Sequence, residues 1–149
     1  MLITALLNAL QIVSADEGAL RQAAHSHCLD AQWKLNQAIT ADVACDGKRD
    51  VVLLGSTEHE VIILVFRSGL KKKPDAILFQ TSRVAKETVS LTTESLDVDD
   101  TDFKQMLGET PEGFRRSKIC KGLRLSDGQK DALHVYWHRK RHELSAWSL

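Results

Sequence analysis

Three aspartates in one short segment have the spacing best suited to chemistry. Asp42, Asp46 and Asp50 stand at the first, fifth and ninth places of a loop, and Gly47 follows the second of them. Carboxylate oxygens are the hard ligands that calcium prefers, and glycine permits the sharp turn that lets them converge. We therefore predict a calcium site formed by these three carboxylates. In the alternative interpretation, Asp46 and Gly47 make a plain turn that Asp50 caps.

This segment resembles the calcium loops of FG-GAP and VCBS repeats, the β-propeller modules found in integrins and in many secreted bacterial proteins. The resemblance covers about residues 42–55, where Asp46-Gly47-x-x-Asp50 leads into an apolar run. In those repeats the third place of the loop is Asp or Asn and the fourth is usually Gly. This chain has Ala44 and Cys45 there. The resemblance implies calcium as the cofactor, with one oxygen ligand of the usual set missing.

A second copy of the pattern occurs about eighty residues later, as Asp127-Gly128-Gln129-Lys130-Asp131. The first and third places of that loop are Leu123 and Leu125, whose side chains cannot bind a hard cation. We therefore expect a purely structural turn that leads into a strand. Two matches this short fit either an internal duplication or the independent use of one kind of turn.

Histidines provide the other candidate chemistry. His134, His138 and His142 recur at intervals of four, but the surrounding run is typical of a strand, so they do not share one helical face. A small hydrolase using His134 with Asp127 or Asp131 is the alternative function. The sequence has no nucleophile elbow, no Gly-rich phosphate loop and no His-Glu-x-x-His motif, so we assign no catalytic residue.

The leading hypothesis for function is a non-catalytic binding module whose ligand is an unknown protein or small molecule. A hydrolase needs a concave pocket in which its catalytic side chains meet. A binding module is expected to present a flat or rimmed aromatic patch, for which Tyr136, Trp137 and Trp147 are the candidates. The commoner reason for such aromatics is packing across a hairpin.

Charge gives little guidance to partners, because 20 Lys and Arg balance 20 Asp and Glu. No global field therefore attracts nucleic acid or anionic lipid. The two basic clusters are Lys71–Lys73 and His138–His142, and each lies between apolar runs. We interpret both as solvated turns. Neither cluster is interleaved with aromatics that could stack on bases, so we predict no nucleic-acid partner.

Seven short apolar runs predict the elements that must position these residues. They are rich in Val, Ile, Leu and aromatics, and they cover residues 51–55, 61–66, 76–79, 88–92, 123–125, 132–137 and 144–147. Residues 16–39 indicate one or two helices, and we expect Trp33 to pack on the sheet. Residues 103–107 indicate a short helix within a long connection between two strands. The prediction is an α+β, β-rich fold, in which an N-terminal helical segment precedes a meandering antiparallel sheet of about seven strands.

Residues 1–15 have two interpretations, and residues 16–149 form a single β-rich domain in both. The run Leu2–Ala15 has the length of a signal-peptide apolar region and ends in a suitable cleavage tripeptide, although no Lys or Arg precedes Arg21. The same run is also typical of an amphipathic helix, and it is too short for a transmembrane span. We predict a periplasmic or secreted protein, with a cytoplasmic location as the alternative.

Three cysteines fit that compartment. Cys28, Cys45 and Cys120 include no Cys-x-x-Cys pair, which argues against structural zinc. In an exported chain we expect one disulfide and one spare thiol, and the spacing does not reveal the pairing. The Asp42 loop and the strand His134–Trp137 also resemble small uncharacterised secreted proteins of Gram-negative bacteria, which implies the same compartment.

Overall fold

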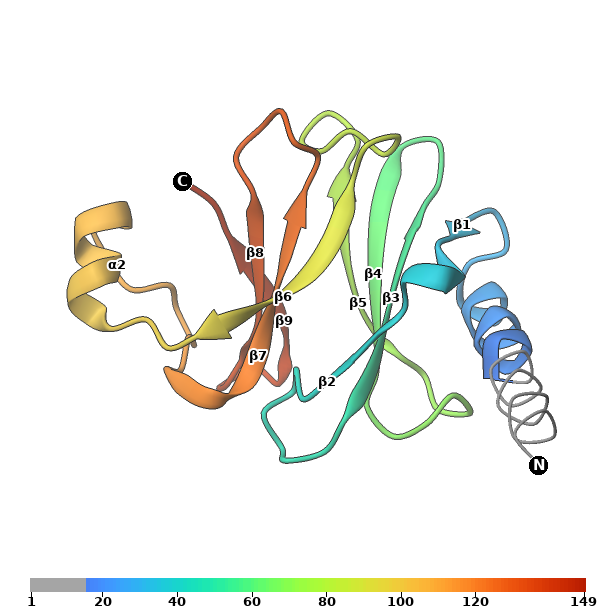
Figure 1. Cartoon of the computed structure of the whole chain (residues 1–149), viewed down its shortest axis with the longest axis horizontal. Coiled ribbons are helices and arrows are strands. Elements are labelled where there is room, and N and C mark those ends of the chain that lie inside the picture. The colour runs from blue at the N-terminus through green and yellow to red at the C-terminus, as the bar shows by residue number, and fades with distance from the viewer. Residues whose placement is uncertain (1–15) are drawn as a thin grey trace, which may run out of the picture.

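The computed structural model describes residues 16–149, so the predicted signal peptide or amphipathic helix at residues 1–15 lies outside the described residues. Nine strands form two antiparallel sheets that lie face to face (Figure 1). A helix covers the outer side of each sheet (Figure 1). The predicted α+β, β-rich class is therefore confirmed, and the single predicted sheet is in fact two.

The first sheet contains five strands in the order β1-β3-β4-β5, with β2 pairing beside β1 on β3. Their bounds are β1 Gln32–Trp33, β2 Ile39–Ala41, β3 Asp50–Ser56, β4 Glu60–Phe66 and β5 Asp75–Gln80. Strands β3 and β4 form a hairpin, with Val51 opposite Phe66 and Ser56 opposite Val61. Strands β1 and β2 were missed because two or three residues are too few to show an alternating pattern.

The second sheet is a four-strand meander in the order β6-β7-β8-β9. Its bounds are β6 Ser90–Leu96, β7 Ser117–Ser126, β8 Leu133–His138 and β9 Glu143–Trp147. All seven predicted strands are thus present across the two sheets. The helix predicted at residues 103–107 is also confirmed as α2, Asp100–Leu107, which lies in the excursion between β6 and β7.

Strand β4 shows why the central strands of the first sheet have nearly continuous apolar sequences. Val61, Ile63 and Val65 face the core between the sheets, and the residues between them face the other way. That outer side is covered by the helix of residues 16–27, so both faces of the strand are buried. A strand with two buried faces needs apolar side chains at every position.

Trp33 packs on the outer side of this sheet, as predicted. Its indole ring lies directly against the backbone of Gly55 in β3, and a Cβ atom at that position would overlap the ring. Beyond Trp33, helix 16–27 contributes Leu20 and Ala24 to the same outer cluster, and the remaining residues up to Ile39 are not helical apart from one short 3-10 turn. Within residues 16–149, no helix is long and apolar enough to cross a membrane.

The outer side of the second sheet is covered by α2 and the loop that follows it. Phe103 of α2 packs edge-on against Trp147 of β9, with ring centroids 5.5 Å apart. Phe114 packs in the same way against Tyr136 of β8, also at 5.5 Å. These contacts account for the aromatic residues of the C-terminal strands as packing groups.

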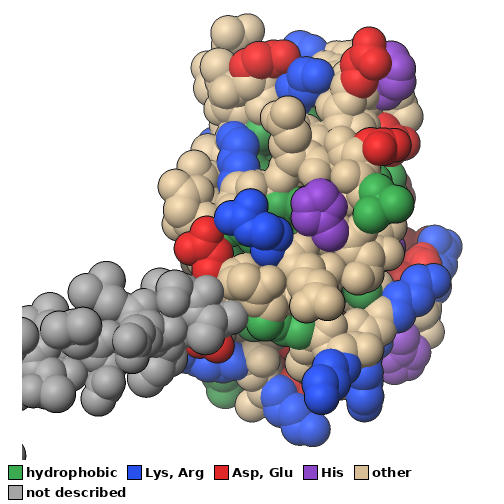
Figure 2. Space-filling model, turned by 90° about the vertical axis from the view of Figure 1, so that its right-hand side faces the viewer, with side chains coloured by type: hydrophobic (Ala, Val, Ile, Leu, Met, Phe, Trp, Pro, Cys, Tyr) green, Lys and Arg blue, Asp and Glu red, His purple; other side chains and the backbone are tan. Residues whose placement is uncertain are grey.

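Figure 2 shows the side of the molecule on which the N-terminal helix lies, where charged side chains of both signs are scattered and apolar patches are small. Lys and Arg gather at its lower edge. The loop between β4 and β5, which carries Lys71–Lys73, lies at that end of the molecule in Figure 1. All three lysines are exposed, so the predicted solvated turn is confirmed at this cluster.

Candidate functional site

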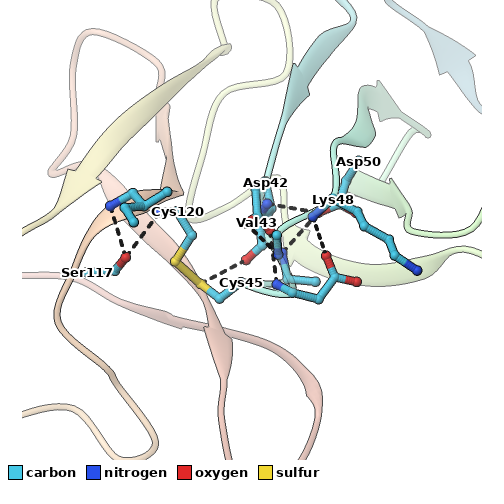
Figure 3. The surroundings of a disulfide bond; sticks show 11 residues. Asp42, Val43, Cys45, Lys48, Asp50, Ser117 and Cys120 are labelled. Atoms are coloured by element: carbon cyan, nitrogen blue, oxygen red, sulfur yellow. Dashed lines mark hydrogen bonds between the residues drawn. A yellow bond between two sulfur atoms is a disulfide. The ribbon is translucent and has the colours of Figure 1, made fainter.

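The Asp42 loop joins β2 to β3 and is held by hydrogen bonds to its own backbone. The Asp42 carboxylate accepts the N–H groups of Asp46 at 3.2 Å and Gly47 at 2.9 Å. The Asp46 carboxylate accepts the N–H of Lys48 at 2.9 Å. The carboxylates are therefore occupied in forming the turn (Figure 3). Short polar side chains commonly hold turns in this way.

Asp50 is fully buried at the start of β3, where one carboxylate oxygen accepts the N–H groups of Val43 at 2.8 Å and Ala44 at 2.9 Å. The other oxygen, Oδ1, has no hydrogen-bond partner. Burial raises the pKa of this carboxyl above its ordinary value; the two N–H donors oppose that shift, and the charges of Asp46 and Asp42 add to it.

The three predicted calcium ligands thus do different structural work. In residues 16–149, no group of three or more His, Cys, Asp or Glu side chains is placed to hold a metal ion. The hydrogen bonds match the alternative interpretation, in which Asp46 and Gly47 form a turn and Asp50 caps it. Calcium binding by this loop stays a prediction of the sequence alone.

The same loop carries one half of a disulfide between Cys45 and Cys120, which are 75 positions apart (Figure 3). Cys120 lies on β7, where Ser117 Oγ accepts the N–H groups of Ile119 and Cys120 beside an irregularity in the pairing with β6. The bond therefore ties the first sheet to the second. Cys28 is the spare thiol. The expected count of one disulfide is confirmed.

A small cleft opens beside this disulfide, between the Asp42 loop and the turn that joins β8 to β9. We name it the disulfide cleft. Its volume is about 240 Å³, below the roughly 300–1,000 Å³ of pockets that take drug-sized ligands. Its lining residues come from five separate segments: Ala44, Cys45, Asp46, Arg67, Leu96, Arg115, Tyr136, Trp137, Arg139 and His142.

The turn from β8 to β9 is built on a buried histidine. His138 is 1% exposed, and its Nδ1 accepts the N–H of Arg141 at 3.1 Å while its carbonyl accepts the N–H of His142 at 2.9 Å. The prediction of a solvated turn is therefore wrong for His138, because this side chain forms the inner wall of the turn. Accepting a backbone N–H requires Nδ1 to be unprotonated.

Gly113 fits against the ring of His138, and a Cβ atom there would overlap the ring. Its positive φ of 72° also favours glycine. The Gly113 carbonyl accepts the N–H of Arg139 at 3.0 Å. This contact joins the loop after α2 to the turn His138–His142 between β8 and β9, which we call the basic turn. It brings two lining residues of the cleft, Arg115 and Arg139, to the same end of the molecule.

Backbone strain is concentrated at the cleft. Within residues 16–149, Cys45 with φ 57° and His142 with φ 53° are the non-glycine residues in the left-handed region. Both line the disulfide cleft. Each such conformation costs about 1–2 kcal/mol, and strain of this kind persists where the surrounding structure imposes it, often at functional sites.

The charge of the lining is mostly positive. Arg67, Arg115 and Arg139 face one carboxylate, that of Asp46. Arg67 is fixed in place because its Nε lies 2.6 Å from Oδ2 of Asp75 and its guanidinium lies 4.6 Å from the centre of the Trp137 ring. Such a cation–π contact orients the arginine against the wall of the cleft.

His134, the residue of the alternative hydrolase, lies elsewhere. Its Nδ1 is 2.9 Å from both carboxylate oxygens of Glu94, and its ring stacks on Trp147 with centroids 3.9 Å apart. In the described chain no hydrogen bond joins His134 to Asp127 or Asp131, so the proposed pairing with them is not what the structure shows. His134 does not line the disulfide cleft.

Asp127 is occupied by backbone donors. Its carboxylate accepts the N–H groups of Gln129 and Lys130 in its own turn and that of Ala85 in the loop between β5 and β6, each at 2.9 Å. These bonds, that to Ala85 first, lower the pKa of Asp127 to about 2. The second Asp-Gly turn, between β7 and β8, is therefore joined to the loop between β5 and β6, which agrees with its predicted structural role.

The two Asp-Gly turns occupy different places in the two sheets. The first turn joins β2 to β3 in the first sheet. The second turn joins β7 to β8, which are the second and third strands of the four-strand meander. The buried aspartate also differs, being Asp50 at the end of the first motif and Asp127 at the start of the second. This favours independent use of one turn over duplication.

Tyr136 and Trp137 line the disulfide cleft but do not form a flat exposed aromatic patch. Trp137 faces the core between the sheets, whereas Tyr136 faces the outer cluster under Phe114, and both side chains are buried. The candidate site residues that the sequence did not indicate are Arg67 and Arg115. They stand outside both basic clusters, and only the fold brings them to the basic turn.

No protein family, characterised protein or solved structure matches this chain.

Proposed function

We propose that this protein is a non-catalytic binding module whose ligand site is the disulfide cleft. The observation that carries the proposal is that both strained residues, Cys45 and His142, line this one cleft. A loop tied by a disulfide and a turn built on a buried histidine hold the two strained conformations in place. Such support is typical of a site whose shape matters to its function.

A binding role is favoured over the alternative hydrolase because the candidate groups do not assemble. Nδ1 of His134 lies 2.9 Å from the carboxylate of Glu94 on the outer face of the second sheet, and Ser126 and Asp127 are engaged in turn hydrogen bonds. A hydrolase needs a nucleophile and a base within reach of each other beside a pocket. The cleft itself holds arginines and no hydroxyl other than that of Tyr136.

We further propose a periplasmic or extracellular location, with the cytoplasm as the alternative. A disulfide such as Cys45–Cys120 persists in oxidising compartments and is rare in the cytosol. The loop that carries Cys45 forms one wall of the cleft, so the integrity of the disulfide and that of the site depend on each other.

The test is an amide NMR screen of the oxidised protein with a mixed set of small organic fragments. We expect fragments to shift the amide signals of Cys45, Asp46, Arg139 and His142 more than those elsewhere. The variant His142→Gly should keep or gain thermal stability, since glycine adopts a positive φ at little cost, and should bind the same fragments more weakly.

Two results would overturn this proposal. The first is fragment shifts that cluster away from the cleft. The second is hydrolysis of an ester, phosphoester or peptide substrate that the wild-type protein performs and the variant His134→Ala does not.

A further inference from the structure

We propose that the disulfide cleft binds an oxyanion, the carboxylate or phosphate group of a small ligand, between the guanidinium groups of Arg115 and Arg139. This inference rests on the proposed function, because it names the ligand class of the same site. It is independent of the calcium prediction for the Asp42 loop.

Within residues 16–149, Arg115 and Arg139 are unpaired, whereas neighbouring arginines are not. Neither Arg115 nor Arg139 forms an ion pair or a side-chain hydrogen bond in this part of the chain. Arg116, next to Arg115, binds Asp97 at 2.5 Å, and Arg141, near Arg139, binds Glu112 at 3.1 Å. Acidic partners are therefore available at this end of the molecule, and they are taken by arginines outside the cleft.

Further hydrogen-bond donors surround the same space. The Nε of Arg67 donates a hydrogen bond to Asp75, which leaves the terminal nitrogens of that guanidinium for other acceptors. His142 adds an imidazole to the lining. The one acidic lining residue, Asp46, has a carboxylate oxygen engaged by the N–H of Lys48. The balance of charge facing the cleft is positive.

Part of the wall of the cleft is apolar. Ala44, Leu96 and Trp137 line the cleft and are all buried side chains. Apolar walls lower the local dielectric constant, so a charge-assisted hydrogen bond is stronger there than on an open surface. Arginine recognises carboxylate and phosphate through two parallel N–H···O bonds, a geometry that a lysine cannot reproduce.

The cluster Lys71–Lys73 offers a weaker case for anion binding. Its three ammonium groups stand on an exposed loop, and the groove of about 620 Å³ beside them is lined otherwise by the N-terminal helix and by Leu70 and Pro74. Exposed lysines act as solvated point charges without fixed directions. The directional donors of the disulfide cleft therefore make it the better oxyanion site.

The experiment is an NMR titration of the oxidised protein at low ionic strength with inorganic phosphate, sulfate, acetate and succinate, using chloride as the reference anion. We expect saturable shifts at Cys45, Arg115, Arg139 and His142. The variants Arg115→Gln and Arg139→Gln should each weaken binding about 10-fold or more, since a charge-assisted hydrogen bond contributes roughly that factor.

Lys140→Gln is the matched control, because it removes the same charge from the same turn but Lys140 does not line the cleft. We expect it to weaken binding less than about 2-fold, and Arg139→Lys, which keeps the charge, to recover only part of the wild-type affinity. All the replaced side chains are exposed, and thermal melts check that each variant is folded.

The outcomes separate this inference from the proposed function. If fragments bind in the cleft but none of the four anions does, the oxyanion inference is wrong and the binding module stands. If Lys140→Gln weakens binding as much as Arg139→Gln, the attraction is a diffuse surface charge and the inference is also wrong. A preference among phosphate, sulfate and the carboxylates identifies the group that the natural ligand carries.

Discussion

The disulfide should contribute a large share of the stability of this fold. The perturbation is the double variant Cys45→Ser with Cys120→Ala, which keeps a polar side chain at the exposed position and a small apolar one at the buried position. Without the bond, the Asp42 loop and β7 are no longer tied across the two sheets. The variant should fold and be less stable than the oxidised wild type.

The expected magnitude follows from the separation of 75 positions between the two cysteines. In the chain-entropy model, a closed loop of about 75 residues removes ~15 cal/mol/K from the unfolded chain, or about 4.5 kcal/mol at 25 °C. For a chain of about 150 residues, 1 kcal/mol corresponds to roughly 2–4 °C, so the melting temperature should fall by roughly 9–18 °C.

The assay is urea unfolding followed by tryptophan fluorescence, with thermal melts in parallel. Cys28→Ala is the matched control, because it removes a thiol and leaves the Cys45–Cys120 bond intact. The reduced wild-type protein should behave like the double variant. A double variant within about 1 kcal/mol of the oxidised wild type would refute the reasoning, since it would show that the two sheets hold together without the bond.

Three further outcomes can be checked. Gly55→Ala should lower the free energy of unfolding by about 1–3 kcal/mol, because the added methyl overlaps the ring of Trp33. Gly18→Ala in the N-terminal helix should raise the free energy of unfolding, because its methyl meets open space. Equal effects of the two substitutions in urea unfolding would contradict this reasoning. The Asp127 carboxyl should titrate by NMR with a pKa of about 2 instead of 3.8. Its stabilising contribution is therefore present above pH 3.8 and is lost as the pH falls toward 2. A titration midpoint near 3.8 would show that the backbone hydrogen bonds of Asp127 are absent. If the loop Asp42–Asp50 binds calcium, millimolar calcium raises the melting temperature and a chelator reverses the effect; no shift rejects the calcium prediction.

The candidate site was predictable from the sequence only in part. The basic turn was visible as a cluster, and the Asp42 loop as a turn, but nothing in their spacing shows that they meet. His138 reads as one more charged residue in a solvated turn, and only the fold shows that its ring is buried against Gly113. Burial depends on which segments pack against a side chain, and those segments are distant in sequence.

The sequence by itself determined the strands, because β-branched and apolar runs between turn residues favour extended structure wherever they occur. It also determined the two Asp-Gly turns, since these are closed by hydrogen bonds between residues two to seven positions apart. Such local interactions form without help from the rest of the chain. The short strands β1 and β2 lack this local signal, and they form because β3 offers them an edge.

The tertiary structure decided how those strands divide into two sheets, which cysteines pair and what the turns do. Cys45 joins Cys120 and not Cys28 because the packing of the sheets brings the Asp42 loop against β7. Arg67 and Arg115 meet the basic turn for the same reason. These contacts are between residues far apart in the chain, and their geometry is fixed by the core that the two sheets share.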